Sequence, residues 1–385
     1  MYTLKLILRN ALRHKLRTTL TALGIVVTIV AFGLLQTIVD AWYAGAAGAS
    51  ATRLVTRNAI SLVFPLPLSY QAKIRSVPGV TGVSHANWFG GVYVSEKNFF
   101  PQFAVEAESY FRLYPEYRVP QDQFREFLRD RRGAIVGRKT AQTFGFRIGD
   151  VVPLKGTIYP GDWQFVVRGI YTGADSRTDE SQFFFHWTYL NEYVRERLAR
   201  RADTVGVYVV QVASAEDVPR VAEAIDALFR NSLAETRTES EQAFQLSFVS
   251  MTEAILILIR VVSFVVIAII LAVMANTMAM TARERASEYA TFKALGFRPS
   301  FLAGLIFGES LAIAVTAGAL GIALTFPVSR RFAQAMGTLF PVFEVSGSTV
   351  ALQLACACAV GAAAAVLPAW RAARVPVAEG LRNIG

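Results

Sequence analysis

The stretch TTLTALGIVVTIVAFGLLQTIV, residues 18–39, carries no charged side chain over 22 residues. A bilayer core of about 30 Å needs about 20 apolar residues in a helix, so this segment is long enough to cross one. Residues 254–282, 300–327 and 346–370 have the same apolar character. The sequence therefore predicts an α-helical membrane protein with four transmembrane helices.

Composition agrees with this prediction. Of the 385 residues 53% are hydrophobic and only 18% charged, which is too apolar for an ordinary soluble enzyme. Residues 40–253 contain 24 Lys and Arg and 24 Asp and Glu, so the whole net charge of +10 lies in and beside the apolar stretches. A nucleic-acid-binding protein would carry its basic charge on a folded domain. We therefore expect membrane lipids, and no nucleic acid, as partners.

Basic residues in the short flanking segments predict the orientation. Twelve Lys and Arg fall within residues 1–17, 283–299 and 371–385, and the positive-inside rule places these segments in the cytoplasm. The large domain of residues 40–253 is then outside. Two arginines in the short external loop of residues 328–345 count against this assignment but are outnumbered. We expect a multi-pass inner-membrane protein with cytoplasmic termini and a periplasmic domain.

Residues 1–17 predict an amphipathic helix. Leucines recur every four residues beside a basic stripe, so the helix is expected to lie in the cytoplasmic membrane interface. The alternative is that this segment only obeys the positive-inside rule. The apolar stretch after it exceeds the roughly 7–15 residues of a secretory signal, which predicts an uncleaved anchor.

The domain between the first two apolar stretches alternates strand-like and helix-like segments, which predicts an α+β fold. Strand and helix units in residues 68–85 and 204–229 suggest a ferredoxin-like body split in the sequence. Short strands with tight turns between them, such as residues 134–137 and 146–154, predict an inserted β-rich lobe. Residues 236–251 are expected to form a helical stalk leading into the second span.

Catalytic signatures are missing from the sequence. It has no G-x-S-x-G elbow, no H-E-x-x-H helix and no clustered cysteine ligands, so we expect neither a catalytic site nor a metal site. The phosphate-binding loop G-x-x-x-x-G-K-[ST] is also missing, which predicts no cofactor in this chain. The aromatic run of residues 183–187 is interpreted as a buried strand edge, with a partner or substrate contact as the alternative.

Polar residues inside apolar stretches are costly and therefore informative. Glu309 lies about ten residues into the third stretch, about 15 Å deep at 1.5 Å per residue. A structural hydrogen bond to another span is favoured over proton coupling, with Asn276 and Thr277 as candidate partners. Small residues on the third span permit close helix packing. They are Ala314, Ala317, Gly318 and Gly321.

Three consecutive motifs carry a family resemblance. Asn276-Thr277-Met278, Arg283-Glu284-Arg285-Ala286-Ser287-Glu288 and Lys293-Ala294-Leu295-Gly296 resemble the N-T-M, E-R-x-x-E and K-A-L-G motifs of the FtsX-like, MacB-type permeases. These form the mechanotransmission, or type VII, class of ABC transporters. The order of one span, a large external domain and three further spans is similar over nearly the whole chain. Tyr289-Ala290 departs from the usual Ile-Gly, which puts the fit to an ATPase in doubt.

The resemblance implies a non-enzymatic permease subunit of an ABC transporter, with a separate ATPase subunit that binds ATP and Mg. A second permease, identical or related, and a periplasmic adaptor are the other partners implied. The function implied is efflux or export of a lipophilic or peptide cargo. The competing interpretation is a regulator that transports nothing and activates a periplasmic partner such as a cell-wall hydrolase.

The coupling segment of residues 283–299 is the expected contact with the ATPase. The alternative is a loop that only sets orientation. The coupling residues implied by the resemblance are Arg283, Glu284, Arg285, Glu288 and Lys293.

Overall fold

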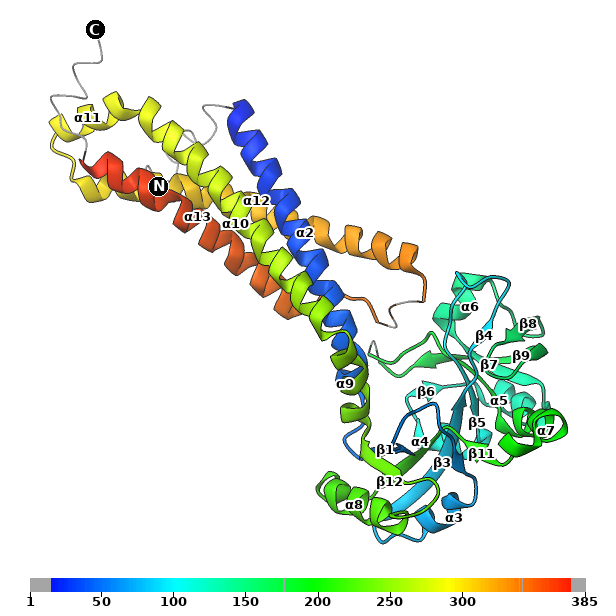
Figure 1. The fold of residues 1–385 in the computed structure, drawn as a ribbon. Coiled ribbons are helices and arrows are strands. Elements are labelled where there is room, and N and C mark those ends of the chain that lie inside the picture. Colours follow the sequence, from blue (N-terminus) through cyan, green and yellow to red (C-terminus); the bar gives the residue numbers. More distant parts are fainter. Residues whose placement is uncertain (1–14, 176, 339, 341, 375–385) are drawn as a thin grey trace. The chain divides into compact units, whose positions relative to one another are not determined.

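The computed structural model describes residues 15–175, 177–338, 340 and 342–374 (Figure 1). The chain forms two compact units. The helical unit comprises Met1–Asp40, Glu253–Ala335 and Phe343–Gly385, and the inserted domain comprises Ala41–Thr252 and Met336–Val342. Most of the predicted interfacial helix of residues 1–17, and the tail after residue 374, lie outside the described residues.

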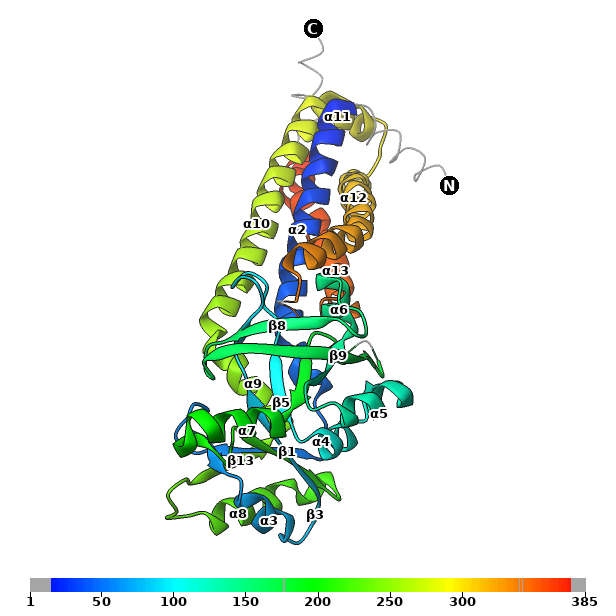
Figure 2. The same cartoon turned by 90° about the vertical axis from the view of Figure 1, so that its right-hand side faces the viewer.

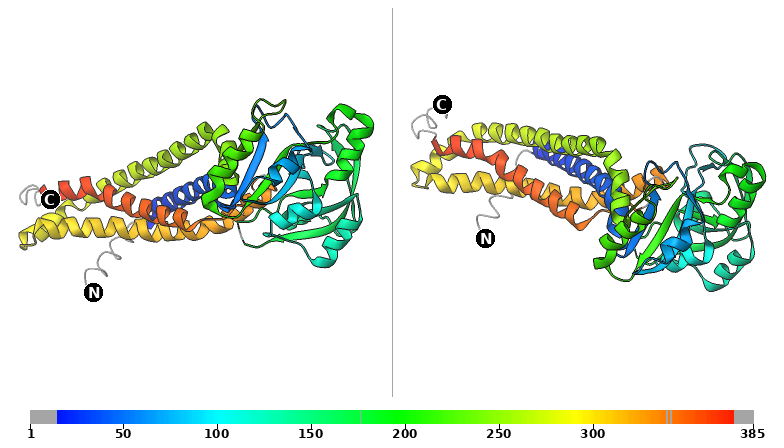
Figure 3. Two further views of the ribbon diagram at one scale, coloured as in Figure 1. Left: turned by 90° about the horizontal axis from the view of Figure 1, so that it is seen from below. Right: turned by 60° about the horizontal axis from the view of Figure 1, so that its bottom comes forward.

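The helical unit is built from four long helices that are apolar and long enough to cross a membrane, which confirms the predicted set of four apolar helices. A short helix, α11, joins α10 to α12 at one end of the unit (Figure 2). In both views of Figure 3, α13 runs alongside α10 and α12. The bounds are α2 Lys15–Gly48, α10 Glu253–Glu284, α11 Ala286–Ala294, α12 Pro299–Met336 and α13 Gly347–Arg374.

Small residues bring α12 close to its neighbours. A Cβ atom added at Gly318 would lie 2.6 Å from the Cβ of Ala357 on α13, and one at Gly321 would lie 2.9 Å from the Cβ of Ile29 on α2. Ala314 and Ala317 are buried on the same helix. Without a hydrophobic driving force between helices in lipid, such close backbone approach supplies the packing energy that holds a bundle together.

An eleven-stranded mixed sheet runs through the inserted domain in the order β13-β1-β12-β3-β5-β10-β7-β9-β8-β4, and β6 pairs with β9. A separate pair joins β2 to β11. The bounds are β1 Arg53–Asn58, β2 Leu66–Pro67, β3 Val80–Trp88, β4 Gly91–Val92, β5 Gln102–Val105, β6 Tyr117–Arg118, β7 Gly133–Gly137, β8 Val151–Gly156, β9 Gly161–Gly173, β10 Phe183–His186, β11 Thr204–Val205, β12 Val207–Val212 and β13 Thr236–Ser240.

Seven α-helices accompany these strands among the described residues of the inserted domain, together with two short 3-10 turns. Helix α3 (Tyr70–Arg75) packs against β3, and helix α8 (Val218–Leu228) packs against β13, at one end of the sheet. The bounds are α3 Tyr70–Arg75, α4 Ala107–Leu113, α5 Gln121–Arg129, α6 Arg138–Phe144, α7 Trp187–Arg197, α8 Val218–Leu228 and α9 Glu241–Met251, with the 3-10 turns at Ala199–Arg201 and Ala215–Asp217.

Alternation along the strands creates a hydrophobic core on each face of the sheet. In β10 the rings of Phe183 and Phe185 join one core, and the ring of Phe184 joins the other. Val210 and Val209 of β12 divide between the two cores in the same way. Successive side chains in a strand point to opposite faces, so a run of apolar residues fits a strand that is covered on both sides.

Strand pairing refines the expectations about this domain. The strands of the predicted β-rich lobe continue the first sheet, because β5 pairs with β3 and β10 with β5. Pairing satisfies the backbone groups that an edge strand would leave exposed. For the same reason β10 is an interior strand with a neighbour on each side, not an edge. The stalk helix begins only at Glu241, since residues 236–240 pair with β1 as strand β13.

We predict that Gly321→Val destabilises the helical unit. The added side chain would meet Ile29 and the carbonyl oxygen of Val26, 3.2 Å from the new Cβ, and such overpacking costs about 1–3 kcal/mol. Gly304→Val is the matched control, because Gly304 lies on the same helix with nothing within 4 Å of its added Cβ. Thermal unfolding in detergent should give a lower midpoint for Gly321→Val alone, and equal midpoints would contradict the packing.

Candidate functional site

Nine residues of the predicted coupling segment form the helix α11, whereas Arg283 and Glu284 are the last residues of α10. Helix α11 ends before Gly296, whose φ of 87° is the left-handed conformation that commonly terminates helices and that glycine adopts without strain. Tyr289 and Ala290 are buried, with Tyr289 in the core of the helical unit. The departure from the family's usual Ile-Gly pair therefore concerns packing inside this chain.

Arg285, at the junction of α10 and α11, forms the central ion pair of this region. Its Nη1 donates to Glu309 Oε2 at 3.0 Å and its Nε donates to Glu288 Oε2 at 3.0 Å. Arg285 and Glu309 are both buried. The predicted partners of Glu309 were Asn276 and Thr277, so this contact with Arg285 corrects that expectation. A guanidinium supplies the charge that a buried carboxylate needs, and a neutral amide does not.

The other predicted coupling residues also bind within the chain, with one exception. Glu284 accepts two hydrogen bonds from Arg17 of α2, each 2.8 Å long. Lys293 Nζ donates to the carbonyl oxygen of Ala373 on α13 at 2.8 Å. Arg283 is exposed. Glu284, itself exposed, therefore joins α10 to α2, Arg285 joins the start of α11 to α12, and Lys293 joins α11 to α13. The exposed residues on and just after α11 include Thr291, Leu295, Phe297 and Arg298.

Asn276 does not take part in this cluster. It lies on the exposed side of α10. A polar side chain on a lipid-facing surface is costly unless another protein surface covers it.

Sequence reasoning missed two polar contacts within the helical unit. Gln353 Nε2 donates to the carbonyl oxygen of Ile29 at 2.8 Å and to Thr325 Oγ1 at 2.9 Å, which joins α13 to α2 and α12. Asp40 Oδ2 accepts from Ser346 at 2.6 Å and from Thr349 at 2.9 Å. A glutamine inside a charge-free stretch and an acid directly after one are signals that single out both residues.

The inserted domain has a buried ion cluster where β1 begins. Arg53 Nε donates to Glu241 Oε2 at 2.9 Å, and its terminal nitrogens donate to Glu116. The guanidinium also lies 4.1 Å from the ring centre of Tyr114. Burial opposes the charge of Arg53, but the hydrogen bond with Glu116 and the charge of Glu241 raise its pKa above the usual range. This cluster ties β1 to the first turn of α9.

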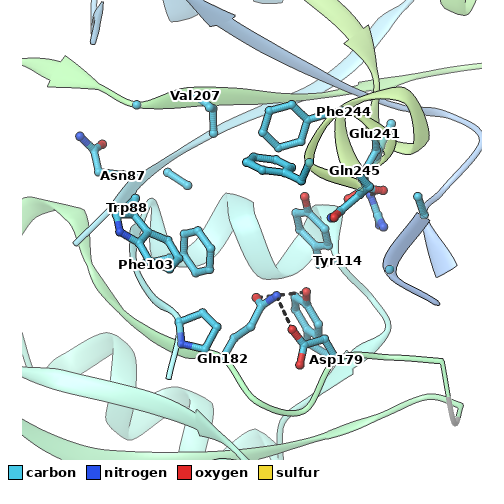
Figure 4. A pocket seen from close by; sticks show the side chains of 18 of the residues that line it. Asn87, Trp88, Phe103, Tyr114, Asp179, Gln182, Val207, Glu241, Phe244 and Gln245 are labelled. Atoms are coloured by element: carbon cyan, nitrogen blue, oxygen red, sulfur yellow. Dashed lines mark hydrogen bonds and ion pairs between the residues drawn. The ribbon is translucent and has the colours of Figure 1, made fainter. Parts of the chain in front are cut away.

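A cavity of about 990 Å³ lies beside this ion cluster. In Figure 4 the side chains of Trp88 and Phe103 lie on one side of it and those of Tyr114 and Phe244 on the other. Its walls come from β1, β3 and β5, from the segments before β6 and β10, from the C-terminal end of α2 and from α9. The volume is at the upper end of the range of small-molecule sites, about 300–1,000 Å³.

Comparison with known families gives two matches. The sequence model described as "FtsX-like permease C-terminal" matches residues 260–377, and the one described as "MacB-like periplasmic core domain" matches residues 18–228, more than half of the chain. No protein of curated function matches the chain.

Three solved structures each match about half of this chain at low identity. The extracellular domain of the noncanonic ABC-type transporter YknZ from Gram-positive bacteria is 13% identical, with a TM-score of 0.35 over 49% of this chain and 99% of that one. The periplasmic region of MacB from Actinobacillus actinomycetemcomitans is 9% identical, with a TM-score of 0.36 over 52% and 94%. A domain of a putative permease from Porphyromonas gingivalis is 12% identical, with a TM-score of 0.33 over 49% and 87%.

We predict that Arg53→Leu strongly destabilises the inserted domain. Removing one partner of a buried ion pair leaves the other charge unpaired, which costs about 3–5 kcal/mol. Arg195→Leu is the control, because Arg195 pairs with Asp203 on the surface, where such pairs contribute less than about 1 kcal/mol. Denaturant unfolding followed by tryptophan fluorescence measures both, and similar losses of stability would show that the Arg53 cluster is no stronger than a surface pair.

Proposed function

Since this chain belongs to the family of FtsX-like, MacB-type permeases, we propose that it is the membrane subunit of an ABC transporter that passes ATP-driven motion to its periplasmic domain. In this proposal the chain itself is not an enzyme. A separate ATPase subunit binds ATP and Mg and works at the cytoplasmic side of the inner membrane, where both termini of this chain lie. The work done outside is efflux or export of a lipophilic or peptide cargo.

The observation that carries the proposal is how two spans join the inserted domain. Helix α2 runs without interruption from Lys15 to Gly48, so the first span and the start of the inserted domain share one continuous helix. At the other side α9 is separated from α10 only by Thr252, whose side-chain oxygen accepts a hydrogen bond from Trp42 Nε1 of α2 at 2.5 Å. Movement of either helix is therefore passed directly to β1 and β13, the adjacent strands to which they lead.

The cytoplasmic contact is proposed for α11 and its exposed neighbours. The pair of Arg285 with Glu309 fixes α11 to α12, so force applied to α11 reaches the third span without loss in a flexible loop. Arg283 and Arg298 are exposed and positively charged, which suits an acidic surface on an ATPase.

A second permease, identical or related, completes the proposed assembly. The exposed position of Asn276 on an apolar helix supports this, because a second copy would cover a polar group that lipid cannot satisfy. A periplasmic adaptor is a further proposed partner of the inserted domain. The competing function, regulation of a periplasmic hydrolase without transport, has less support, because the cavity beside Arg53 offers the inserted domain room for a small molecule.

Affinity purification from native membranes with mass spectrometry tests the proposal. We expect a stoichiometric ATPase subunit with the wild-type chain, and its loss with the charge reversals Arg283→Glu and Arg298→Glu, because both residues are exposed beside α11. A hydrolase in place of an adaptor in the same eluate would favour the regulator.

The control is a charge swap of Arg17 and Glu284. Glu284→Arg alone breaks the contact with Arg17, and Arg17→Glu together with Glu284→Arg re-forms it with opposite polarity. If the role of Glu284 is its ion pair with Arg17, the variant with both Arg17→Glu and Glu284→Arg retains the ATPase, and Glu284→Arg alone loses it. Absence of an ATPase from the wild-type eluate under mild extraction would contradict the permease function itself.

A further inference from the structure

The cavity beside Arg53 has an excess of negative charge in its interior. Arg53 is buried and shared between two carboxylates, Glu116 and Glu241, so this cluster carries a net negative charge. The other arginines in the lining, Arg177 and Arg201, are exposed. The positive charge of Arg53 is therefore neutralised deep in the cavity. The remaining positive charges of the lining, on Arg177 and Arg201, lie on exposed side chains.

Asp179 is a partly buried carboxylate of the lining, whereas Asp175, which also belongs to the lining, is exposed. Asp179 Oδ2 accepts from Gln182 Nε2 at 3.0 Å and its Oδ1 accepts from Ser181, so its hydrogen-bond partners among the described residues are neutral (Figure 4). Lys139 is close enough to feel the charge of Asp179, but it is not part of the lining, and its ammonium group donates to the carbonyl oxygen of Phe340.

Aromatic rings form two opposite walls. Trp88 and Phe103 meet edge to face with their centres 5.2 Å apart, and Phe244 and Phe248 of α9 do the same at 5.1 Å. The faces of such rings attract cations and also offer apolar contact area. Asn87, buried in the wall, donates from Nδ2 to Tyr159, while its Oδ1 has no partner within the described part of the chain. That unpaired group is a hydrogen-bond acceptor, which again suits a ligand that carries donors or positive charge.

We propose that this cavity binds a hydrophobic organic cation, with its apolar body between the aromatic walls and its charge toward Asp179. The assignment rests on the proposed function in one respect, since it names the class of cargo that the inserted domain holds. Charge complementarity supports it over an organic anion, which would face carboxylates where the cavity is most buried.

One wall of the cavity is movable in the transport proposal. Glu241, Phe244, Gln245 and Phe248 all belong to α9, which leads through Thr252 into the second span. A shift of α9 would separate Phe244 from the opposite wall and change the size of the cavity. Binding in this cavity and movement of the stalk are therefore coupled.

Saturation binding to the full chain in lipid nanodiscs tests the site, with no ATPase present. The probe is tetraphenylphosphonium, and tetraphenylborate, of nearly the same size and shape but negative charge, is its counterpart. After subtraction of uptake by empty nanodiscs, we expect saturable binding of one tetraphenylphosphonium per chain and no saturable binding of tetraphenylborate. Equal binding of both ions, or no saturable binding of the cation, would overturn the proposal.

Variants place the site within the domain. Asp179→Asn and Phe103→Leu should each weaken tetraphenylphosphonium binding by about three- to tenfold, as expected for loss of a charge or a cation–π contact. Phe244→Leu should do the same if α9 forms a wall. Asp162→Asn is the matched control, because Asp162 is exposed on β9 and outside the lining.

Thermal unfolding of each variant separates a lost contact from a lost fold. A folded Asp179→Asn or Phe103→Leu chain that binds the cation as tightly as the wild type would contradict the site, as would an equal loss in Asp162→Asn. The binding assay needs no ATPase. Absence of an ATPase from the purified chain would contradict the proposed function, whereas absence of cation binding would contradict the cavity proposal alone.

Discussion

The architecture of the inserted domain depends on the antiparallel pairing of β1 with β13. Thr56 and Thr238 are partners in this ladder although 182 residues separate them, and their hydroxyl groups lie 2.9 Å apart. The pairing brings the end of α2 and the start of α9 to adjacent strands. The buried contact of Arg53 with Glu241 closes the same end of the ladder.

The helical unit is constrained by the bilayer, and contacts between polar side chains again hold its elements together. Every backbone polar group must be satisfied inside the bilayer, so helices are required, and polar side chains in them must find partners in neighbouring helices. In the described residues Glu309 pairs with Arg285, and Gln353 Nε2 donates to Ile29 and Thr325, while Gln353 Oε1 has no partner there. Such contacts join the helices of the unit at fixed points.

Much of this organisation could be predicted from the sequence because each signal was local. Long apolar stretches predicted the four apolar helices, and short motifs around Glu284 and Lys293 indicated the family. Pairing between distant segments was not predictable in the same way. The continuation of the sheet through β5 and β10, and the partner of Glu309, depend on contacts between residues whose spacing in the sequence carries no signal. The cavity was missed for the same reason, since its walls come from segments spread between Gly45 and Val342.

The central claim is that movement at the cytoplasmic side reaches the inserted domain through α2 and α9. Distance measurement by electron spin resonance tests it most directly, with labels at Gln242, exposed on α9, in both permeases of an assembly containing the ATPase. The two native cysteines, Cys356 and Cys358, would be replaced by alanine. The account predicts that ATP binding shifts the distance between labels. An unchanged distance in an ATP-loaded, intact complex would contradict it.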